Sequence, residues 1–235
     1  MQKILAIIPA FNEEKNIRNV ITDVRKSGFP VDLVVIDDGS IDNTANNAQK
    51  DGAIVISLPF NLGIGGAVQT GFKYAYENDY DIAIQFDGDG QHKASEIGKL
   101  IENVVNNACD VAIGSRFLNN NGYRTPMARK LGIRIFSFIN TLIVGQRITD
   151  NTSGFRAYNR KAIKFLSRNY PVDYPEVEAI ILLNKNRFRI LEVPVLMQQR
   201  LYGNSSINTL KAIYYMIKVT LSILIGVLRE RERID

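Results

Sequence analysis

Short apolar runs alternate with amphipathic stretches over the first half of this 235-residue chain. Runs this apolar are typical of strands buried on both faces of a sheet. They predict strands at Ile4–Ile8, Leu33–Ile36, Ile54–Ile56, Ile82–Phe86 and Val111–Ile113. The stretches between them predict helices at about Glu13–Lys26, Thr44–Lys50, Gly66–Tyr76 and Ala94–Asn107. Asn12 and Asp42 are capping-type residues near the start of two of these helices. The alternation predicts an α/β fold with a mainly parallel central sheet, flanked by helices and connected by right-handed crossovers.

The pattern becomes less regular after Arg116. It predicts a loop at Asn119–Tyr123, an apolar segment at Ile133–Val144, a turn at Ser153–Gly154 and one more strand at Ile190–Val195. A long apolar and helical stretch begins near Ser206. We therefore expect one domain over residues 1–205 and a C-terminal amphipathic helix with a charged tail over residues 206–235.

Composition supports a globular α/β domain, because 46% of the residues are hydrophobic and 23% are charged. The single cysteine, Cys109, cannot form an intramolecular disulfide, and Pro9 interrupts an N-terminal apolar run that is too short for a secretory signal. We expect a reducing, cytoplasmic location. The net charge of +5 suits anionic small molecules or an anionic membrane surface as well as nucleic acid.

Polar residues follow the first two strands, at the carboxyl-terminal edge where open α/β sheets bind ligands. The candidates there are Pro9, Asn12, Glu13, Asp37 and Asp38. A carboxylate at a strand end can accept a hydrogen bond from a base N–H or a ribose hydroxyl, and Pro9 and Phe11 could form a wall beside a planar base. The alternative for Asp37–Ser40 is a turn followed by a helix cap.

A glycine-rich segment, Asn61–Ala67, follows the third strand. It fits neither the dinucleotide-binding pattern nor the P-loop pattern. Its glycines favour a structural role, in which the helix beginning near Gly66 approaches the sheet or a ligand closely.

The most specific signal is an acidic D-x-D formed by Asp87 and Asp89, directly after the strand Ile82–Phe86. Two adjacent carboxylates repel one another unless a cation lies between them. Together with the amide of Gln91, they suit Mg²⁺ or Mn²⁺, with phosphate oxygens and water as the remaining ligands. The alternative is a surface Asp-Gly turn. His92 is the only histidine, so a His-rich zinc site cannot form.

Arg116 follows the fifth strand, where its guanidinium could bind phosphate oxygens in a bidentate manner. Other arginines in the second half could also face phosphates, although each is more often a solvated surface charge: Arg129, Arg134, Arg156 and Arg200.

Taken in order, the motifs P-A-F-N-E-E, D-D-G-S, D-G-D-G-Q-H, G-S-R and D-N-T-S-G-F-R resemble those of family 2 inverting glycosyltransferases, which have the GT-A fold. The similarity extends from the first strand to about Ile207, and the branch of dolichyl- and polyprenyl-phosphate sugar transferases is the most similar. The resemblance implies a nucleotide-sugar site made by Pro9, Asn12, Glu13, Asp37, Asp38 and Asp87. It implies Mg²⁺ or Mn²⁺ held by Asp87, Asp89 and Gln91.

The resemblance also implies an acceptor phosphate site formed by Arg116, Arg129, Arg200 and Ser205. The segment after Arg200 departs from the usual R-x-x-G-E-S-K of this branch, because Asn204 replaces the acid and Ser206 the lysine. The chain has no tryptophan, so it lacks the Q-x-x-R-W motif of processive polysaccharide synthases.

A phosphate acceptor agrees with the lack of an obvious Glu-Asp catalytic-base pair in the second half. A phosphate monoester is already anionic near neutral pH, since its second pKa is about 6, whereas a hydroxyl needs a general base. We expect a polyprenyl-phosphate oxygen to displace the nucleoside diphosphate with inversion, assisted by the metal on Asp89 and by Arg116. If the acceptor is a hydroxyl of a lipid-linked saccharide, Asp150 is the candidate base. A non-catalytic nucleotide-sugar-binding protein is disfavoured by the paired carboxylates, and no nucleic-acid partner is expected.

The C-terminal stretch Ala212–Leu228 falls short of a transmembrane helix, because Lys218 interrupts it and a span needs about 20 apolar residues. Its apolar residues recur at helical spacing, which predicts an amphipathic helix. That helix could lie on a membrane surface, pair with a second copy in a homo-oligomer or pack on its own domain. We expect a peripheral protein on the cytoplasmic face of the membrane.

Overall fold

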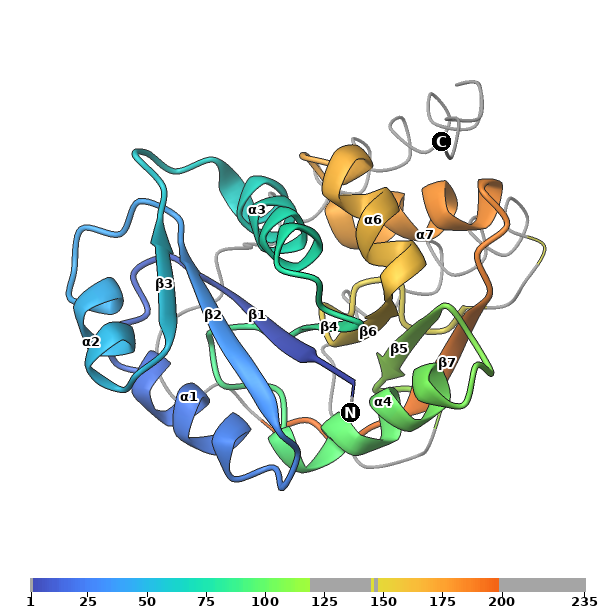
Figure 1. Ribbon diagram of the computed structural model, residues 1–235, viewed down its shortest axis with the longest axis horizontal. Coiled ribbons are helices and arrows are strands. Elements are labelled where there is room, and N and C mark those ends of the chain that lie inside the picture. The colour runs from blue at the N-terminus through green and yellow to red at the C-terminus, as the bar shows by residue number, and fades with distance from the viewer. Residues whose placement is uncertain (1, 119–144, 146–147, 199–235) are drawn as a thin grey trace, which may run out of the picture.

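The computed structural model describes residues 2–118, 145 and 148–198, which form a seven-stranded sheet in the order β3-β2-β1-β4-β6-β5-β7 (Figure 1). The strands are β1 (Ile4–Ala10), β2 (Val31–Asp37), β3 (Ile54–Ser57), β4 (Ile82–Gln85), β5 (Val111–Ser115), β6 (Arg156–Asn159) and β7 (Ile190–Pro194). All neighbouring strands are parallel except β6, which is antiparallel to both β4 and β5. The predicted α/β fold with a mainly parallel sheet is confirmed.

Six of the seven strands were predicted, and β6 was not. Its sequence, R-A-Y-N, contains no apolar run, yet Arg156 and Tyr158 are both fully buried. The strand therefore has the burial of a central strand without the composition of one. Because β6 lies between β4 and β5 and is antiparallel to both, it is the strand that makes this mainly parallel sheet mixed.

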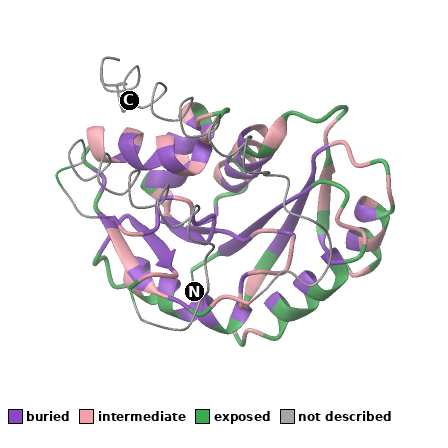
Figure 2. Cartoon of the chain, turned by 180° about the vertical axis from the view of Figure 1, so that it is seen from behind, coloured by how far each residue is buried: buried purple, intermediate pink, exposed green. Residues whose placement is uncertain are grey.

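Helices cover both faces of the sheet. They are α1 (Ile17–Arg25), α2 (Thr44–Lys50), α3 (Gly63–Glu77), α4 (Ile97–Val105), α6 (Arg160–Asn169) and α7 (Pro175–Lys185), with a 3₁₀ turn at Ala94–Glu96 before α4. Helices α3, α6 and α7 lie on one face, whereas α1, α2 and α4 lie on the other (Figure 1). Alternate residues of β1 enter the two cores, since Leu5 and Ile7 belong to the first and Ile4 and Ile8 to the second. Figure 2 shows the buried central strands between the more exposed outer surfaces of the helices.

Two predicted helix caps were wrong. Helix α1 begins at Ile17, and its N-cap is Asn16. Asn12 has a positive φ of 54°, and its Oδ1 accepts a hydrogen bond from the Ile41 N–H of the neighbouring loop at 3.0 Å. Helix α2 begins where predicted, but its N-cap is Asn43. The carboxylate of Asp42 instead accepts a hydrogen bond from the Thr44 N–H at 2.9 Å.

Helix α3 makes the close approach that was expected, but the glycine that touches the sheet is Gly71, outside the glycine-rich segment. A Cβ on Gly65 would lie 2.4 Å from the carbonyl oxygen of Val172, and a Cβ on Gly71 would lie 2.2 Å from Cγ2 of Ile7 in β1. Helix α3 therefore lies close to β1 at Gly71, while its first turn contacts the loop between α6 and α7 at Gly65.

Several predicted features fall outside the described residues: the loop at 119–123, the segment Ile133–Val144 and the C-terminal stretch 206–235. Among the helices of the described part of the chain, none is long and apolar enough to cross a bilayer.

Candidate active site

A cleft of about 780 Å³ lies at the carboxyl ends of β1, β2 and β4. Its lining includes six of the residues that the sequence analysis singled out: Pro9, Asn12, Glu13, Asp38, Asp87 and Asp89. Parallel strands bring their following loops to one edge, which explains why motifs separated by about 80 residues in the sequence share this cleft. Phe11 also lines the cleft and is 47% exposed, so its ring is available to contact a ligand.

The carboxylate of Asp38 connects two of the loops that form the cleft. Its Oδ1 accepts a hydrogen bond from the Leu62 N–H at 2.7 Å, and its Oδ2 accepts one from the Gly63 N–H at 2.9 Å. Burial raises the pKa of Asp38 although both hydrogen bonds favour the ionised form. The carboxylate thus holds the glycine-rich segment against the end of β2, a structural contact that the sequence did not predict.

The loop after β2 packs tightly against the segment after β3. Gly39 has a φ of +73°, and a Cβ at this position would lie 2.8 Å from the Phe60 carbonyl carbon. Asp37 is buried and accepts a hydrogen bond from the Ser40 N–H at 3.2 Å. The D-D-G-S motif therefore makes a turn, as the structural alternative expected, and also contributes Asp38 to the cleft.

Asp87 follows β4 and is surrounded by groups that orient its carboxylate. Nε2 of His92 lies 2.9 Å from its Oδ2, and the His92 ring stacks on Phe155 with centroids 4.9 Å apart. A Cβ on Gly154 would lie 2.7 and 2.8 Å from the two carboxylate oxygens, so only glycine leaves room for them. Burial alone would raise the pKa of Asp87, but the interaction with His92 and the positive charges of Arg116 and Arg156 lower it below its usual range. The carboxylate is therefore ionised near neutral pH.

Asp89 lines the cleft two residues further on, and its Oδ1 accepts a hydrogen bond from the Gln91 N–H at 3.0 Å. Among the described residues, Gln91 does not line this cleft. Its carbonyl accepts a hydrogen bond from the Gln198 N–H at 2.9 Å, while Nε2 of Gln198 donates to the Gly90 carbonyl at 2.8 Å. The segment that follows β7 is therefore bound directly to the D-x-D loop.

The carboxylates of Asp87 and Asp89 fit a hard divalent cation, because both line the cleft and offer oxygen ligands. In the part of the chain that the structure describes, no three His, Cys, Asp or Glu side chains gather to hold a metal by themselves. Mg²⁺ commonly binds through one or two carboxylates together with substrate phosphates and water. The site fits such a shared metal better than a permanent structural one.

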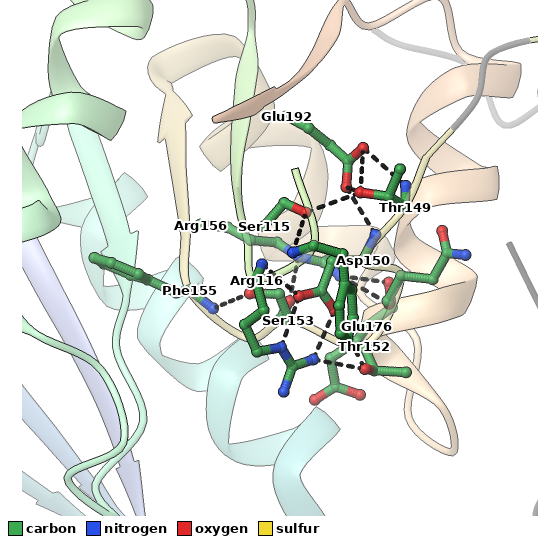
Figure 3. Close-up of polar contacts among 12 residues, drawn as sticks. Ser115, Arg116, Thr149, Asp150, Thr152, Ser153, Phe155, Arg156, Glu176 and Glu192 are labelled. Atoms are coloured by element: carbon green, nitrogen blue, oxygen red, sulfur yellow. Dashed lines mark hydrogen bonds and ion pairs between the residues drawn. The ribbon is translucent and has the colours of Figure 1, made fainter. Parts of the chain in front are cut away.

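Arg116 and Asp150 form a buried ion pair beyond the end of β5 (Figure 3). Nε of Arg116 lies 2.7 Å from Oδ2 of Asp150 and Nη2 lies 2.6 Å from Oδ1, while the Arg116 N–H also donates to Oδ2 at 3.0 Å. Asp150 is fully buried. Since a general base must reach the proton that it removes, this geometry favours an anchoring role for Asp150.

Arg156 holds together the segment 150–156 and does not face solvent. The guanidinium is fully buried and donates to the carbonyls of Ser153 at 2.8 Å, Glu176 at 2.7 Å and Asn151 at 3.3 Å. Arg156 was among the arginines predicted to be able to face a phosphate, and these contacts show that it supports the loop instead. Burial raises the pKa of the neighbouring Glu176 carboxyl.

The remaining predicted acceptor residues, Arg129, Arg200 and Ser205, lie outside the described residues. His92, Gly154 and Glu192, which contribute to the geometry of the site, were not predicted as site residues. His92 is the last residue of the D-G-D-G-Q-H motif and Gly154 lies within the D-N-T-S-G-F-R motif, so only these two carried a sequence signal.

Residues 5–166 match the family model described as "Glycosyl transferase family 2". The chain belongs to glycosyl transferase family 2. This glycosyltransferase is 37% identical over 212 residues to the UDP-N-acetylglucosamine–dolichyl-phosphate N-acetylglucosaminyltransferase of Methanococcus voltae, with 82% of the chain and 84% of the relative covered. It is 28% identical to the polyprenol monophosphomannose synthase of Mycolicibacterium smegmatis, over 88% of the chain and 82% of the relative.

Among solved structures, this family 2 glycosyltransferase is similar to glucosyl-3-phosphoglycerate synthase from Mycobacterium tuberculosis, whose crystals contain Mn²⁺, UDP and glucosyl-3-phosphoglycerate. The TM-score is 0.74 at 20% identity, and 96% of this chain and 80% of that chain are covered. At this identity the likeness establishes the shared GT-A fold alone.

Proposed function

We propose that this family 2 glycosyltransferase moves a sugar from a nucleotide-sugar to a polyprenyl phosphate, of the undecaprenyl or dolichyl type, with inversion at the anomeric carbon. The observation that carries the proposal is the ion pair between Asp150 and Arg116, which occupies the Asp150 carboxylate. Asp150 was the only base that the sequence suggested for a hydroxyl acceptor. A phosphate acceptor brings its own anionic oxygen and needs no base.

The nucleotide-sugar occupies the cleft at the ends of β1, β2 and β4. Asn12, Glu13 and the Pro9–Phe11 wall line this cleft, together with Asp38 and residues of the glycine-rich segment. We assign the divalent cation to Asp87 and Asp89, with Gln91 as a nearby third candidate. When bound there, Mg²⁺ or Mn²⁺ neutralises charge on the nucleoside diphosphate as it departs.

Arg116 meets phosphate oxygens next to this site. The charge of Arg116 lowers the pKa of Asp87, which supports this assignment. We assign Arg129, Arg200 and Ser205 to the acceptor phosphate as well. The attachment of Gln198 to Gly90 and Gln91 supports this for Arg200, which is only two residues further along the chain.

The names of the relatives support a lipid-phosphate acceptor but differ in the sugar, since one names N-acetylglucosamine and the other mannose. We also propose that the enzyme works at the cytoplasmic face of a membrane, where its lipid acceptor resides, and that residues 206–235 provide the membrane or subunit contact.

A panel assay tests the function. Purified protein with Mg²⁺ or Mn²⁺ is given UDP-N-acetylglucosamine, UDP-glucose or GDP-mannose, together with polyprenyl phosphate, free polyprenol or a lipid-linked saccharide. We expect transfer only to polyprenyl phosphate, and NMR coupling constants of the product should show an inverted anomeric centre. Transfer confined to a hydroxyl acceptor, or retention of configuration, would contradict the proposal.

A further inference from the structure

Glu192 in β7 binds the segment before β6 through its carboxylate. Its Oε1 accepts a hydrogen bond from the Asp150 N–H at 2.7 Å, and its Oε2 accepts one from the Thr149 N–H at 2.8 Å. The Thr149 hydroxyl lies 3.0 and 3.1 Å from the same two oxygens. Two backbone donors therefore converge on one carboxylate, an arrangement that only an acceptor with two oxygens satisfies.

Asp150 links Glu192 to Arg116. Its backbone is held by Glu192, while its carboxylate accepts three hydrogen bonds from Arg116, of 2.6 to 3.0 Å. Oγ of Ser115, the residue before Arg116, lies 2.9 Å from Oγ1 of Thr149 (Figure 3). This contact joins the end of β5 to the same segment that Glu192 binds. Charge-assisted bonds of this length are the strong ones in proteins.

The far end of this connection is the Arg116 guanidinium, which has a further partner. Nη2 of Arg116 also donates to the Thr152 hydroxyl at 2.9 Å, which limits rotation of the guanidinium about its own axis.

We propose that Glu192 is a positioning residue that fixes the Arg116 guanidinium for phosphate oxygens, acting through Thr149 and Asp150. The inference rests on the proposed function, in which Arg116 meets a phosphate. Glu192 lies beside Ile113 in the parallel pair β5–β7, so its effect on Arg116 depends on the register of these two strands.

Glu192→Gln is the first test, because glutamine retains the shape but places an NH₂ against one of the two backbone donors. We expect kcat/KM for polyprenyl phosphate to fall by about 10- to 100-fold, the usual effect of removing a supporting contact behind a functional group. Donor affinity should stay within about twofold. In an Arg116→Ala background, Glu192→Gln should cause no further loss, since it acts only through Arg116. An equal loss in both backgrounds, or no loss in either, would overturn the proposal.

Asp110→Asn is the matched control. Asp110 is also a buried carboxylate that accepts a backbone hydrogen bond, from the Arg189 N–H at 2.8 Å, but it lies just before β5, at the other end of the strand. We expect this variant to lower the melting temperature without changing kcat/KM by more than about twofold. A loss of transfer as large as that of Glu192→Gln would show general damage and overturn the positioning role.

A direct readout separates this inference from the proposed function. The ¹⁵N–¹H signal of the Arg116 Nε–H, assigned by its loss in Arg116→Lys, should exchange with water at least tenfold faster in Glu192→Gln, and also in Thr149→Val if Glu192→Gln does not fold. Unchanged exchange would overturn the positioning role even if the enzyme is active. If the wild type transfers to no polyprenyl phosphate, the proposed function fails, and this signal still decides whether Glu192 positions Arg116.

Discussion

Nε2 of His92 lies 2.9 Å from Oδ2 of Asp87, so the only histidine of the chain is the partner of a carboxylate in the proposed metal site. The His92 ring is held between Phe86 and Phe155, with ring centroids 5.4 and 4.9 Å away. This packing fixes the ring, and the ring in turn fixes one oxygen of Asp87.

Replacing His92 with phenylalanine should weaken binding of Mn²⁺ in the presence of nucleotide by about 10- to 100-fold, because the ring packing is kept and the nitrogen is lost. Electron paramagnetic resonance of free Mn²⁺ measures the affinity. His92→Gln, which can donate a hydrogen bond from its amide, should recover part of it. Unchanged Mn²⁺ affinity in His92→Phe would show that His92 does not orient Asp87.

Asp89→Ala should abolish metal-dependent binding of the nucleotide-sugar and shift the melting temperature by no more than about 2 °C. The reason is that Asp89 lines the same cleft as Asp87, the other proposed metal ligand. Calorimetric titration of the donor with Mg²⁺, and again with excess chelator, measures this. Asp23→Ala, on the exposed surface of α1, serves as the control. Full turnover in chelator would rule out the metal site.

Asp38 should make the stability depend on pH in a defined direction. Its pKa is raised in the folded state, so its contribution is fully present below the unfolded pKa of about 3.9 and is lost as the pH rises through the folded value. The free energy of unfolding of the wild type relative to Asp38→Asn should therefore fall as the pH rises from about 3.9. Urea unfolding at a series of pH values measures the difference. A difference that grows with pH would mean that the bonds from Leu62 and Gly63 outweigh burial.

Arg200→Ala should raise the KM for polyprenyl phosphate and leave donor affinity unchanged. Arg200 lies two positions after Gln198. Gln198 donates hydrogen bonds to backbone carbonyls of the D-x-D loop and is not among the residues that line the donor cleft. Donor titration and acceptor kinetics are measured separately, with Arg187→Ala, a charge removed from the surface before β7, as control. A loss of donor affinity with a normal acceptor KM would show that Arg200 contacts the donor and not the acceptor.

Deleting residues 206–235 should release the protein from membranes or break an oligomer, while donor affinity stays near that of the full chain. Burying the apolar side of this stretch stabilises by about 25 cal/mol per Å² against lipid, a second copy or the protein's own core. Liposome flotation and light scattering of the full and shortened chains distinguish the first two. A shortened chain that does not fold would place the stretch in the core instead.

The pattern of apolar residues was sufficient to predict six strands and the α/β class, because a run buried on both faces needs no knowledge of its neighbours. It was insufficient for β6, whose buried Arg156 depends on carbonyls of the segment 150–156 and of Glu176. The predicted caps failed for a related reason. Asn12 is a residue type that often caps helices, but its side chain instead accepts a hydrogen bond from the Ile41 N–H of the adjacent loop.

For the site, the sequence by itself determined which residues lie at the ends of parallel strands, and hence that Asp38, Asp87 and Asp89 share a cleft. That inference needs only the parallel order of the strands. The pairings Arg116–Asp150, Glu192–Asp150 and His92–Asp87 were decided by the tertiary structure alone. Two of them join residues 34 and 42 positions apart, and the third depends on the packing of Phe155 against the His92 ring. Such contacts depend on strand register and side-chain packing, which a list of residues along one chain does not contain.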